Sequence, residues 1–492
     1  LSKQAVLQRI DRIPVKTIRG VIYDRKMRGI TEGQCTLHAA VVPNECEDKA
    51  EVSHLTGHAI TNEDIQVFPL KTVTEQQAKL VKMKGVTLFN VSNRYDQNGF
   101  LCHVIGYTSD DGGFGIERAC NDYLEIQESD SISMIKNANR EIITGLGYNR
   151  TNKKTYKGIK LSIDYHIQKA AETAMDKSIK SGAAVVVEVA TGDILAMVSR
   201  PGFTQLQMAQ YLLSDEGEFI NRAITPYDIG SVYKTVVAAA ALEEGLFTPN
   251  SLFDCSGKLD ICGQEFVCNE ENGHGSISLE QGFALSCNTV FYNIGQQLGA
   301  NALYKYSKKF GLLDQVLDIP EFWEKSGYAP IEANERETAN LSIGQGKIGI
   351  TPLGVADMFC TIANGGIRQK LSLIRGVVDE NGVSSDIPQK SLGRVISNKT
   401  AVTLQKMLKN AVNEGTGKNA FIDGWGAAGK TGSAQTGWEK DGEIMVHGWF
   451  AGYFPADNPK YVCVILAQNG KTGALCAAPV FKAIGDQIKK LE

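Results

Sequence analysis

The feature that most constrains the fold of this chain is an apolar helix in its middle. Residues 231–244 include four consecutive alanines with apolar residues on every side, and Gly245 ends the run. Alanine has the highest intrinsic helix propensity, and a helix that is hydrophobic all round is buried in the centre of a domain. This segment therefore predicts a central helix around which the rest of a domain packs.

Strand patterns lie on both sides of this helix along the chain. Residues 182–190 and 194–198 are apolar runs separated by a Thr-Gly-Asp turn, which predicts a hairpin. Residues 448–454 and 461–467 predict two further strands, and residues 480–491 predict a terminal helix. Helices in the middle with strands at both ends predict an α+β domain whose sheet pairs the two ends of this region.

The length and charge of the chain limit its organisation and its partners. A chain of 492 residues is too long for one ordinary domain, and a polar, basic linker at 149–155 predicts an N-terminal domain at 1–155 and a second domain at 156–492. The net charge of -4 argues against a nucleic-acid partner, because such proteins usually carry a basic excess. No apolar run approaches the roughly 20 residues that span a bilayer, and the sequence begins at Leu1, so we expect that a native N-terminal anchor or signal has been removed.

Ser231 and Lys234 open the apolar helix and form a candidate nucleophile and base. Ser231 alone could simply cap the helix, but Lys234 shares its helical face at the edge of an apolar segment, where a solvated lysine is not expected. Partial desolvation lowers the pKa of a lysine and makes its neutral amine available to activate a hydroxyl. The helix N-terminus adds N–H groups for a developing oxyanion.

Two further motifs follow this pair in chain order. Residues 286–288 (Ser-Cys-Asn) lie between two helical patterns and are therefore expected on a loop. Residues 430–432 (Lys-Thr-Gly) lie in a segment flanked by glycines, where the backbone can approach a ligand closely. One of these motifs alone is weak evidence for a site. Residues 133–136 also have the spacing Ser-x-x-Lys, and residues 471–473 are a second Lys-Thr-Gly; we assign a role to neither.

The three motifs in this order resemble those of penicillin-binding proteins and serine β-lactamases. The resemblance extends over nearly the whole chain. Matching segments of the transpeptidase domain are the hairpin at 182–198, the Gly-Gln-Gly element within 341–346 and the strand at 447–454, and those of the class B pedestal domain are 19–25 and 115–117. One departure is at 227–230, where the family usually has proline and this chain has Tyr-Asp-Ile-Gly.

The resemblance implies a serine-type D,D-transpeptidase that cross-links peptidoglycan and needs no cofactor for catalysis. Ser231 would attack the carbonyl of a D-Ala-D-Ala stem peptide to form an acyl-enzyme, which an amine from a neighbouring stem then resolves. β-Lactams would acylate the same serine. Lys234 would take the proton of Ser231, Ser286 would relay a proton to the leaving D-Ala, and Asn288 would hold Lys234 and the substrate amide.

The same resemblance implies a binding site for the substrate carboxylate on the strand after residue 429. Lys430 and Thr431 would grip this carboxylate by charge and hydrogen bonding. Gly432 and Ser433 would complete the substrate-binding strand, and the backbone N–H groups of Ser231 and Ser433 would form the oxyanion hole.

Other kinds of protein share parts of this pattern. A β-lactamase normally lacks a long pedestal domain and deacylates quickly, and a β-lactam sensor is tied to a signalling membrane segment. A non-catalytic scaffold is disfavoured by intact Ser231, Lys234, Asn288 and Lys430. His447 is expected to pack or hydrogen-bond rather than to act as a base.

The resemblance also implies where and with what the protein acts. We expect it at the extracytoplasmic face of the bacterial cell membrane, with a polytopic membrane glycosyltransferase as its partner, contacted through the pedestal. A role in cell-wall elongation, division or spore cortex synthesis follows from the same resemblance.

Cysteines and a histidine between the first two motifs predict a structural zinc site. A structural zinc ion prefers four thiolate or imidazole ligands in a tetrahedral arrangement. The spacings here are not of the Cys-x-x-Cys type. Residues 255–275 resemble the metal-binding segment of class B enzymes from anaerobic spore-forming bacteria. This resemblance implies the ligands Cys255, Cys268, His274 and Cys287, with Cys262 or Asp254 as the substitutes. Reduced core thiols and a disulfide between residues 255 and 268 are the alternatives.

Overall fold

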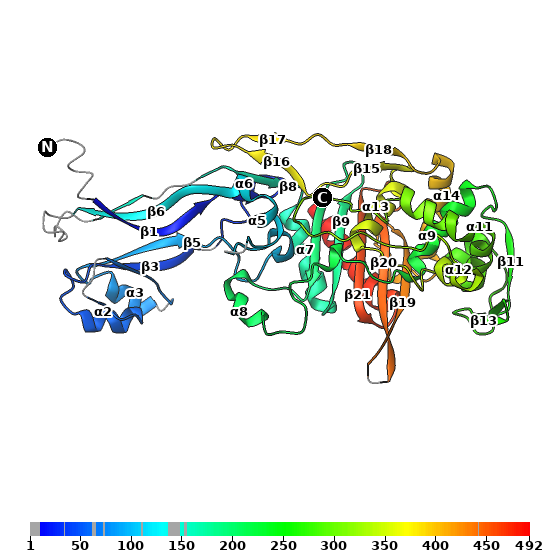
Figure 1. Cartoon of the computed structure of the whole chain (residues 1–492), viewed down its shortest axis with the longest axis horizontal. Helices are drawn as coiled ribbons and strands as arrows, with labels where there is room; N and C mark the ends of the chain where they lie inside the picture. Colours follow the sequence, from blue (N-terminus) through cyan, green and yellow to red (C-terminus); the bar gives the residue numbers. More distant parts are fainter. Residues whose placement is uncertain are drawn as a thin grey trace.

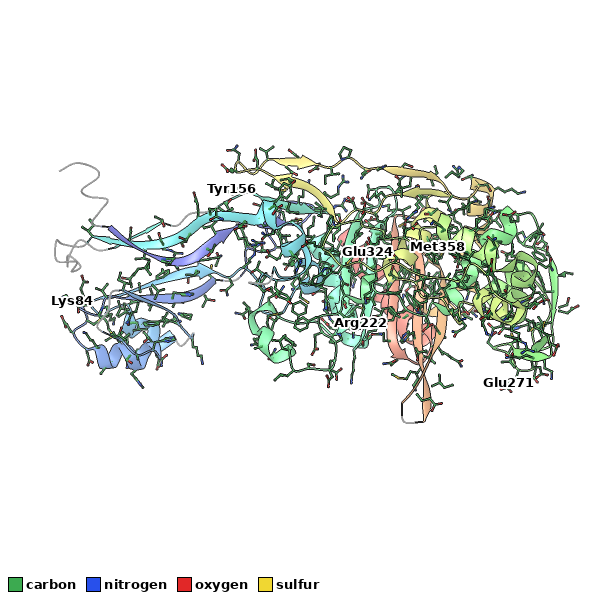
Figure 2. All side chains as sticks on the ribbon, viewed as in Figure 1. Lys84, Tyr156, Arg222, Glu271, Glu324 and Met358 are labelled. Atoms are coloured by element: carbon green, nitrogen blue, oxygen red, sulfur yellow. The ribbon has the colours of Figure 1, made fainter. Side chains whose placement is uncertain are left out.

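The computed structural model describes residues 10–33, 35–61, 65–71, 74–109, 112–135, 148–151, 155–440 and 442–492. The molecule is elongated, with small sheets from the first part of the chain at one end and a larger α+β region at the other (Figure 1). Lys84 lies toward the N-terminal end and Glu271 at the opposite end (Figure 2). Within the described segments, no helix combines the length and the apolar character needed to cross a bilayer.

A five-stranded antiparallel sheet forms the centre of the larger region. Its strand order is β10 (Ile194–Arg200), β9 (Gly182–Glu188), β21 (Tyr461–Gly470), β20 (Glu443–Phe454) and β19 (Ala428–Lys440). The predicted hairpin and the pairing of the two ends of this region are thereby confirmed. β19 is the last strand of this sheet.

Helices cover both faces of this sheet. On one face pack α7 (Tyr165–Ser178) and α15 (Gly473–Leu491), and on the other lie α9 (Lys234–Glu243) and α13 (Pro352–Ala363). Every residue of α9 from 234 to 241 has no exposed surface, which confirms the predicted central helix. The terminal helix begins at Gly473, seven residues before the predicted residue 480, and so contains Pro479, which is disfavoured in a helix interior.

A second group of helices lies beside the free edge strand. It comprises α10 (Leu279–Ala284), α11 (Asn288–Lys309), α12 (Glu335–Ser342) and α14 (Asn398–Asn413). Two small hairpin-like sheets extend from this group (Figure 1). They pair β11 (Leu252–Cys255) with β14 (Gly275–Ser278) and β12 (Lys258–Ile261) with β13 (Gln264–Val267).

The first part of the chain forms two small sheets with short helices. The sheets are β1 (Ile10–Arg19), β6 (Glu125–Ile135) and β7 (Tyr148–Thr151), and β4 (Gln66–Pro69), β3 (Cys35–Val41) and β5 (Val86–Ser92). The helices are α2 (Lys49–Thr56), α3 (Thr74–Leu80), α4 (Cys102–Ile105), α5 (Gly115–Ala119) and α6 (Asn121–Leu124).

Segments from both sides of residue 155 share one sheet and one core. This sheet has the order β17 (Ser384–Asp386), β16 (Ile374–Val378), β8 (Gly158–Leu161) and β2 (Val21–Tyr23). Ile22, Val104 and Ile116 are buried in the same apolar cluster as α9. The division at 155/156 stays a prediction, and residues 152–154 of the predicted linker lie outside the described part.

The remaining elements connect these layers. They are α8 (Met208–Tyr211), β15 (Ile367–Gln369), β18 (Ser391–Arg394) and the 3-10 turns η1 (Gln205–Gln207), η2 (Arg222–Ile224), η3 (Gly230–Tyr233) and η4 (Lys418–Ala420).

Candidate active site

Ser231 lies half-buried in η3, one turn before α9 begins. The preceding Gly230 has φ +56° and donates its N–H to Gly344 O at 2.9 Å. A Cβ at Gly230 would come within 2.9 Å of Ser433 O on β19. A glycine is therefore needed here, because the turn approaches backbone on both sides, and this approach brings Ser231 next to the edge strand.

The turn before Ser231, which lacks the family's usual proline, is held by backbone pairing and a buried indole. Tyr227 exchanges two backbone hydrogen bonds with Ile350, at 3.0 and 2.9 Å. The indole N–H of Trp449 donates to Asp228 O at 2.8 Å. These contacts connect the turn to the helical region and to β20, so its position does not depend on a proline.

Lys234 is buried completely, and its amine reaches both polar residues of the second motif. Its Nζ donates to Ser286 O at 2.7 Å and to Asn288 Oδ1 at 2.7 Å, and it lies 3.3 Å from Ser286 Oγ. All three acceptors are neutral oxygens. Burial lowers the pKa of Lys234 to about 7, while nearby cysteine thiols raise it slightly. A large share of the amine is therefore uncharged at neutral pH, as a base requires.

The loop with Ser286 connects α10 to α11 as the sequence predicts, but Asn288 is already the first residue of α11. Ser286 has φ +57°, a left-handed conformation that is uncommon for residues other than glycine. Two backbone hydrogen bonds connect the loop to α10. Ser286 N–H donates to Phe283 O at 3.2 Å, and Cys287 N–H donates to Gly282 O at 2.8 Å. This conformation points the Ser286 carbonyl and hydroxyl toward Lys234.

Lys430 is the second fully buried lysine of the site, on β19. Its Nζ donates to Thr431 O at 3.2 Å. Burial lowers the pKa of Lys430 well below its usual value, and the charge of Lys234 lowers it further. A buried amine whose contacts are neutral groups favours the binding of an anion beside it. A Cβ at Gly432 would lie 2.9 Å from Ile229 O, so a larger residue would push this strand away from the Ser231 turn.

Several contacts at the site come from residues outside the three motifs. Thr416 Oγ1 lies 2.6 Å from Thr431 Oγ1, and the N–H of Gly473 donates to Ser433 Oγ at 3.2 Å. Gly473 belongs to the second Lys-Thr-Gly sequence, which therefore packs directly behind β19. In the sequence, Thr416 is marked only by the run Gly-Thr-Gly after an amphipathic helix. Such a run is too common to identify a site residue. Lys136, in the other repeated motif, lies outside the described residues.

His447 packs beneath the turn that precedes Ser231. Its ring lies edge-on to Tyr227, with centroids 5.6 Å apart, and 8% of its surface is exposed. Burial lowers the pKa of His447 to about 4, so the ring is neutral at physiological pH. Its Nδ1 has no hydrogen-bond partner in the described part of the chain.

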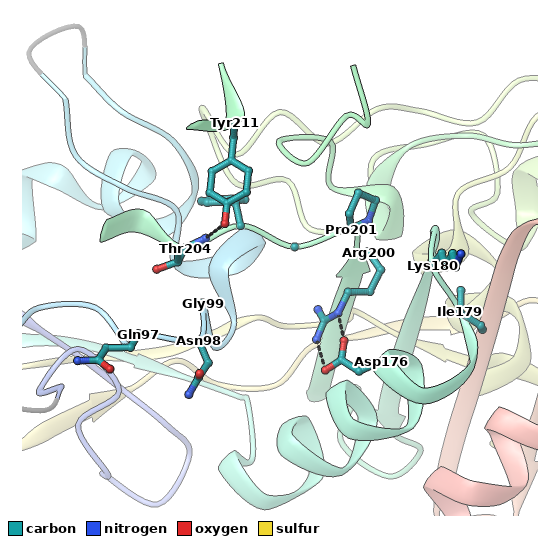
Figure 3. Close-up of a pocket in the computed structure, with 12 residues that line it drawn as sticks. Gln97, Asn98, Gly99, Asp176, Ile179, Lys180, Arg200, Pro201, Thr204 and Tyr211 are labelled. Carbon is teal, nitrogen blue, oxygen red and sulfur yellow. Dashed lines mark hydrogen bonds and ion pairs between the residues drawn. The ribbon is translucent and has the colours of Figure 1, made fainter. Parts of the chain in front are cut away.

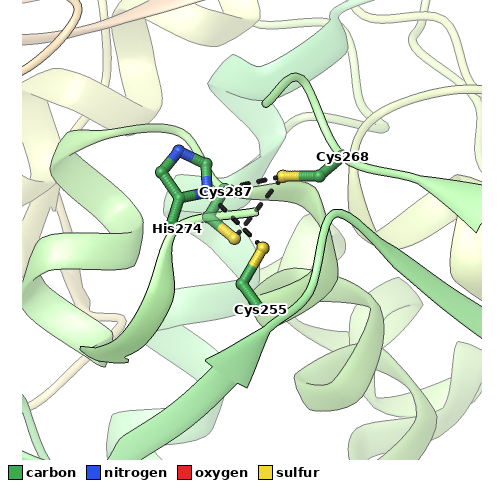
Figure 4. A group of neighbouring side chains, drawn as sticks. All are labelled: Cys255, Cys268, His274 and Cys287. Carbon is green, nitrogen blue, oxygen red and sulfur yellow. Dashed lines mark hydrogen bonds between the residues drawn. The ribbon is translucent and has the colours of Figure 1, made fainter. Parts of the chain in front are cut away.

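Cys255, Cys268, His274 and Cys287 converge beside the catalytic loop (Figure 4). Their ligand atoms all lie within 4.8 Å of one another, and the three cysteines are buried. The Cys287 thiol hydrogen-bonds to Cys268 and lowers the pKa of the latter, which favours a thiolate. The substitute residues Cys262 and Asp254 are both exposed and lie outside this group. All eleven cysteines lie in described segments and each is free.

The spacing within this group fits a tetrahedral ion. Zinc at about 2.3 Å from sulfur and about 2.1 Å from nitrogen places two sulfurs about 3.8 Å apart and a sulfur and nitrogen about 3.6 Å apart. The sulfurs of Cys268 and Cys287 are 3.7 Å apart. His274 Nδ1 lies 3.5 Å from Cys255 Sγ and 3.6 Å from Cys268 Sγ. The donor set and its geometry therefore fit a structural zinc.

A separate cavity of about 470 Å³ lies between residues 97–99 and the start of the loop after β10 (Figure 3). Arg200 pairs with Asp176 on its wall, and Tyr211 OH accepts the N–H of Thr204 at 3.3 Å. The described residues that line it include no member of the three motifs, so the cavity is distinct from the candidate site.

Comparison with known proteins identifies the family of this chain. The model of the penicillin binding protein transpeptidase domain matches residues 182–486. The chain is 28% identical to stage V sporulation protein D of Bacillus subtilis, covering 95% of this chain and 77% of that protein. It is 30% identical to the peptidoglycan D,D-transpeptidase PbpA of Mycobacterium tuberculosis, covering 66% and 70%.

A solved structure shares the fold over almost the whole chain. It is a chain of a peptidoglycan synthase complex, with a TM-score of 0.77 and 24% identity, and the match covers 98% of this chain and 92% of that one. The fold neighbour thus includes the N-terminal sheets as well as the domain with the three motifs. Because the family model covers more than half of the sequence, the chain belongs to the penicillin-binding protein transpeptidases, and to their class B.

Proposed function

We propose that this protein cross-links peptidoglycan stem peptides as a serine D,D-transpeptidase, through an acyl-enzyme on Ser231. The observation that carries the proposal is the buried amine of Lys234, which contacts both Ser286 and Asn288 and has a pKa of about 7. A base beside a helix-end serine is the arrangement that activates a hydroxyl. The named D,D-transpeptidase among the relatives supports the same reaction.

The first half-reaction transfers the stem peptide to the enzyme. Ser231 Oγ attacks the carbonyl carbon of the D-Ala-D-Ala bond while its proton passes to the neutral amine of Lys234. The backbone N–H groups of Ser231 and Ser433 stabilise the oxyanion. The intermediate collapses, the peptide bond breaks, and the leaving amine takes a proton from Lys234 through Ser286 Oγ, which lies 3.3 Å from Lys234 Nζ. D-Ala leaves and an ester on Ser231 remains.

The second half-reaction uses the same groups in reverse. An amine of a neighbouring stem attacks the ester, Lys234 takes a proton from it, and the oxygen of Ser231 is released and reprotonated. Throughout both steps Asn288 holds the amine of Lys234 in place, with Oδ1 at 2.7 Å from Nζ. Lys430 and Thr431, with Gly432, bind the terminal carboxylate of the donor peptide.

Acylation by a labelled penicillin tests this proposal. We expect one adduct on Ser231 by mass spectrometry of the intact protein, stable for minutes or longer. Ser231→Ala should stay unmodified while its melting temperature is unchanged. An unmodified wild-type protein, or an adduct on another residue, would overturn the mechanism. Rapid loss of the adduct would instead indicate a β-lactamase.

We further propose that Cys255, Cys268, His274 and Cys287 hold a structural zinc ion. The tetrahedral spacing of their sulfur and nitrogen atoms supports it. A bound zinc adds stability by linking β11, the segment after β13 and the loop of Ser286, and it takes no part in the reaction.

Partners and location follow from the family. We propose action at the extracytoplasmic face of the bacterial cell membrane, through a native N-terminal anchor, with a polytopic membrane glycosyltransferase as partner. The synthase complex in which the similar fold occurs supports this partner. The relative named for sporulation supports a role in spore formation beside elongation and division.

A further inference from the structure

The hydroxyl of Thr431, in the carboxylate-binding strand, forms a hydrogen bond with a residue outside the three motifs. Its Oγ1 lies 2.6 Å from Oγ1 of Thr416, which is half-buried in the loop between α14 and η4. A hydroxyl has a single proton, so in such a pair one oxygen donates and the other accepts. The direction of this bond decides whether the Thr431 proton is available to a ligand.

The loop with Thr416 is fixed against the other side of the site. The N–H of Thr416 donates to Ala284 O at 3.1 Å, at the end of α10 and two residues before Ser286. A Cβ on Gly415 would come within 2.1 Å of the same carbonyl oxygen, and Gly417 N–H donates to Ala411 O at 2.9 Å. The Thr416 hydroxyl is therefore held between α10 and β19, with little freedom to turn away.

The substrate determines which way the hydrogen bond must run. A carboxylate only accepts hydrogen bonds, so Thr431 must donate its proton to bind one. Thr416 must then donate to Thr431 Oγ1. Ser433 shows the same arrangement two residues along the strand, because its Oγ accepts the N–H of Gly473 at 3.2 Å and its proton is left for a ligand.

We propose that Thr416 is a positioning residue for the terminal carboxylate of the substrate: its hydroxyl donates to Thr431 Oγ1 and thereby presents the Thr431 proton to that carboxylate. The inference rests on the proposed function, in which Lys430 and Thr431 bind this group. Thr416 acts through Thr431 and does not touch the reacting carbonyl. Its loss therefore affects ligands that carry a free carboxylate and leaves neutral ligands unaffected.

The test compares benzylpenicillin with its methyl ester, which lacks the negative charge. In Thr416→Val, which keeps the shape and removes the hydroxyl, we expect the second-order acylation constant for benzylpenicillin to fall about tenfold, the upper end for loss of one hydrogen bond between neutral groups. The constant for the ester should change less than about twofold. Thr416→Ser should restore the wild-type value. Thr403→Val is the matched control, since Thr403 on α14 only donates to Lys399 O.

A double variant tests whether Thr416 acts through Thr431. In a Thr431→Val background the acceptor is gone, so adding Thr416→Val should cause no further loss. Equal slowing with both ligands, no effect with either, or a further loss in the double variant would each overturn the inference. If the valine variant does not fold, Thr416→Ala makes the same comparison. Failure of wild-type protein to be acylated on Ser231 would overturn the proposed function instead.

Discussion

The mechanism that we propose depends on the burial of two lysines. Lys234 and Lys430 have no exposed surface, and burial lowers the pKa of both. A buried ammonium is costly, so each lysine loses its proton more readily than in water. The substrate carboxylate restores charge at Lys430, whereas Lys234 stays available as a base. The environment of each residue thus separates two chemically identical side chains into two roles.

This separation predicts the pH dependence of acylation. Since only the neutral amine of Lys234 accepts the proton of Ser231, and its pKa is about 7, the acylation rate should rise with pH through about 7. Below that pH, Lys234 is protonated and the rate should fall about tenfold for each pH unit. Stopped-flow measurement with a fluorescent penicillin checks this expectation, and a rate that is constant from about pH 5.5 to about 8.5 would contradict it.

Lys234→Met is the control for this profile. Methionine fills a similar buried volume without an amine, so the melting temperature should be retained or raised while acylation falls at least about a thousandfold at every pH. A variant that acylates normally would show that another group is the base.

At the scale of elements, the loop with Ser286 is stabilised by α10 and by the cysteine group. Ser286 has an unfavourable left-handed conformation, with a cost of about 1 kcal/mol or more that surrounding contacts must offset. Those contacts come from α10, through backbone hydrogen bonds, and from Cys287, which is fully buried in the cysteine group. A metal ion bound to Cys287 would add a strong coordination bond at this point of the loop.

Removal of the metal is therefore expected to destabilise the domain. Elemental analysis should find near one zinc per chain, and chelation or Cys268→Ser should lower the melting temperature by about 5 °C or more. Cys262→Ser is the matched control, because Cys262 is exposed and outside the group, and it should leave metal content and melting unchanged. Metal-free protein whose melting is insensitive to chelator would reject the site.

At the scale of the molecule, a buried ion network holds the first part of the chain together. The Glu117 side chain has no exposed surface and pairs with Arg19 at 2.7 Å and with Arg94. It also accepts the hydroxyl of Tyr95 at 3.2 Å, and Arg94 donates to Gly20 O at 3.0 Å. These contacts join β1, α5 and the segment after β5.

Breaking this network should destabilise the molecule without changing its chemistry. Glu117→Gln leaves two largely buried guanidinium groups without an anion, which costs about 3–5 kcal/mol of unfolding free energy. Denaturant unfolding measures this loss. Penicillin acylation of the folded variant should keep its normal rate, since Lys234 and Ser286 have no contact with the network. Glu321→Gln is the control: its pair with Arg118 is exposed, so its loss should cost less than about 1 kcal/mol.

Sequence patterns alone predicted the features that are local or chemical. The alanine-rich run predicted the buried helix, because propensity and hydrophobicity act within a few turns, and two apolar runs separated by a Thr-Gly-Asp turn predicted the hairpin at 182–198. Ser231 and Lys234 at the start of an apolar helix indicated a nucleophile and a base, and the family resemblance supplied the roles of Ser286 and Asn288 and the zinc ligand set.

Which distant groups meet depends instead on the packing of the folded chain. Lys234 contacts residues 52 and 54 positions away, Cys262 is turned outward although it lies between Cys255 and Cys268, and Thr416 approaches Thr431 from another element. None of these contacts has a periodic or propensity signal, because they depend on how helices and sheet pack across long connections. The pKa of Lys234 was likewise set by that packing, since complete burial is a property of the assembled core and not of four residues in sequence.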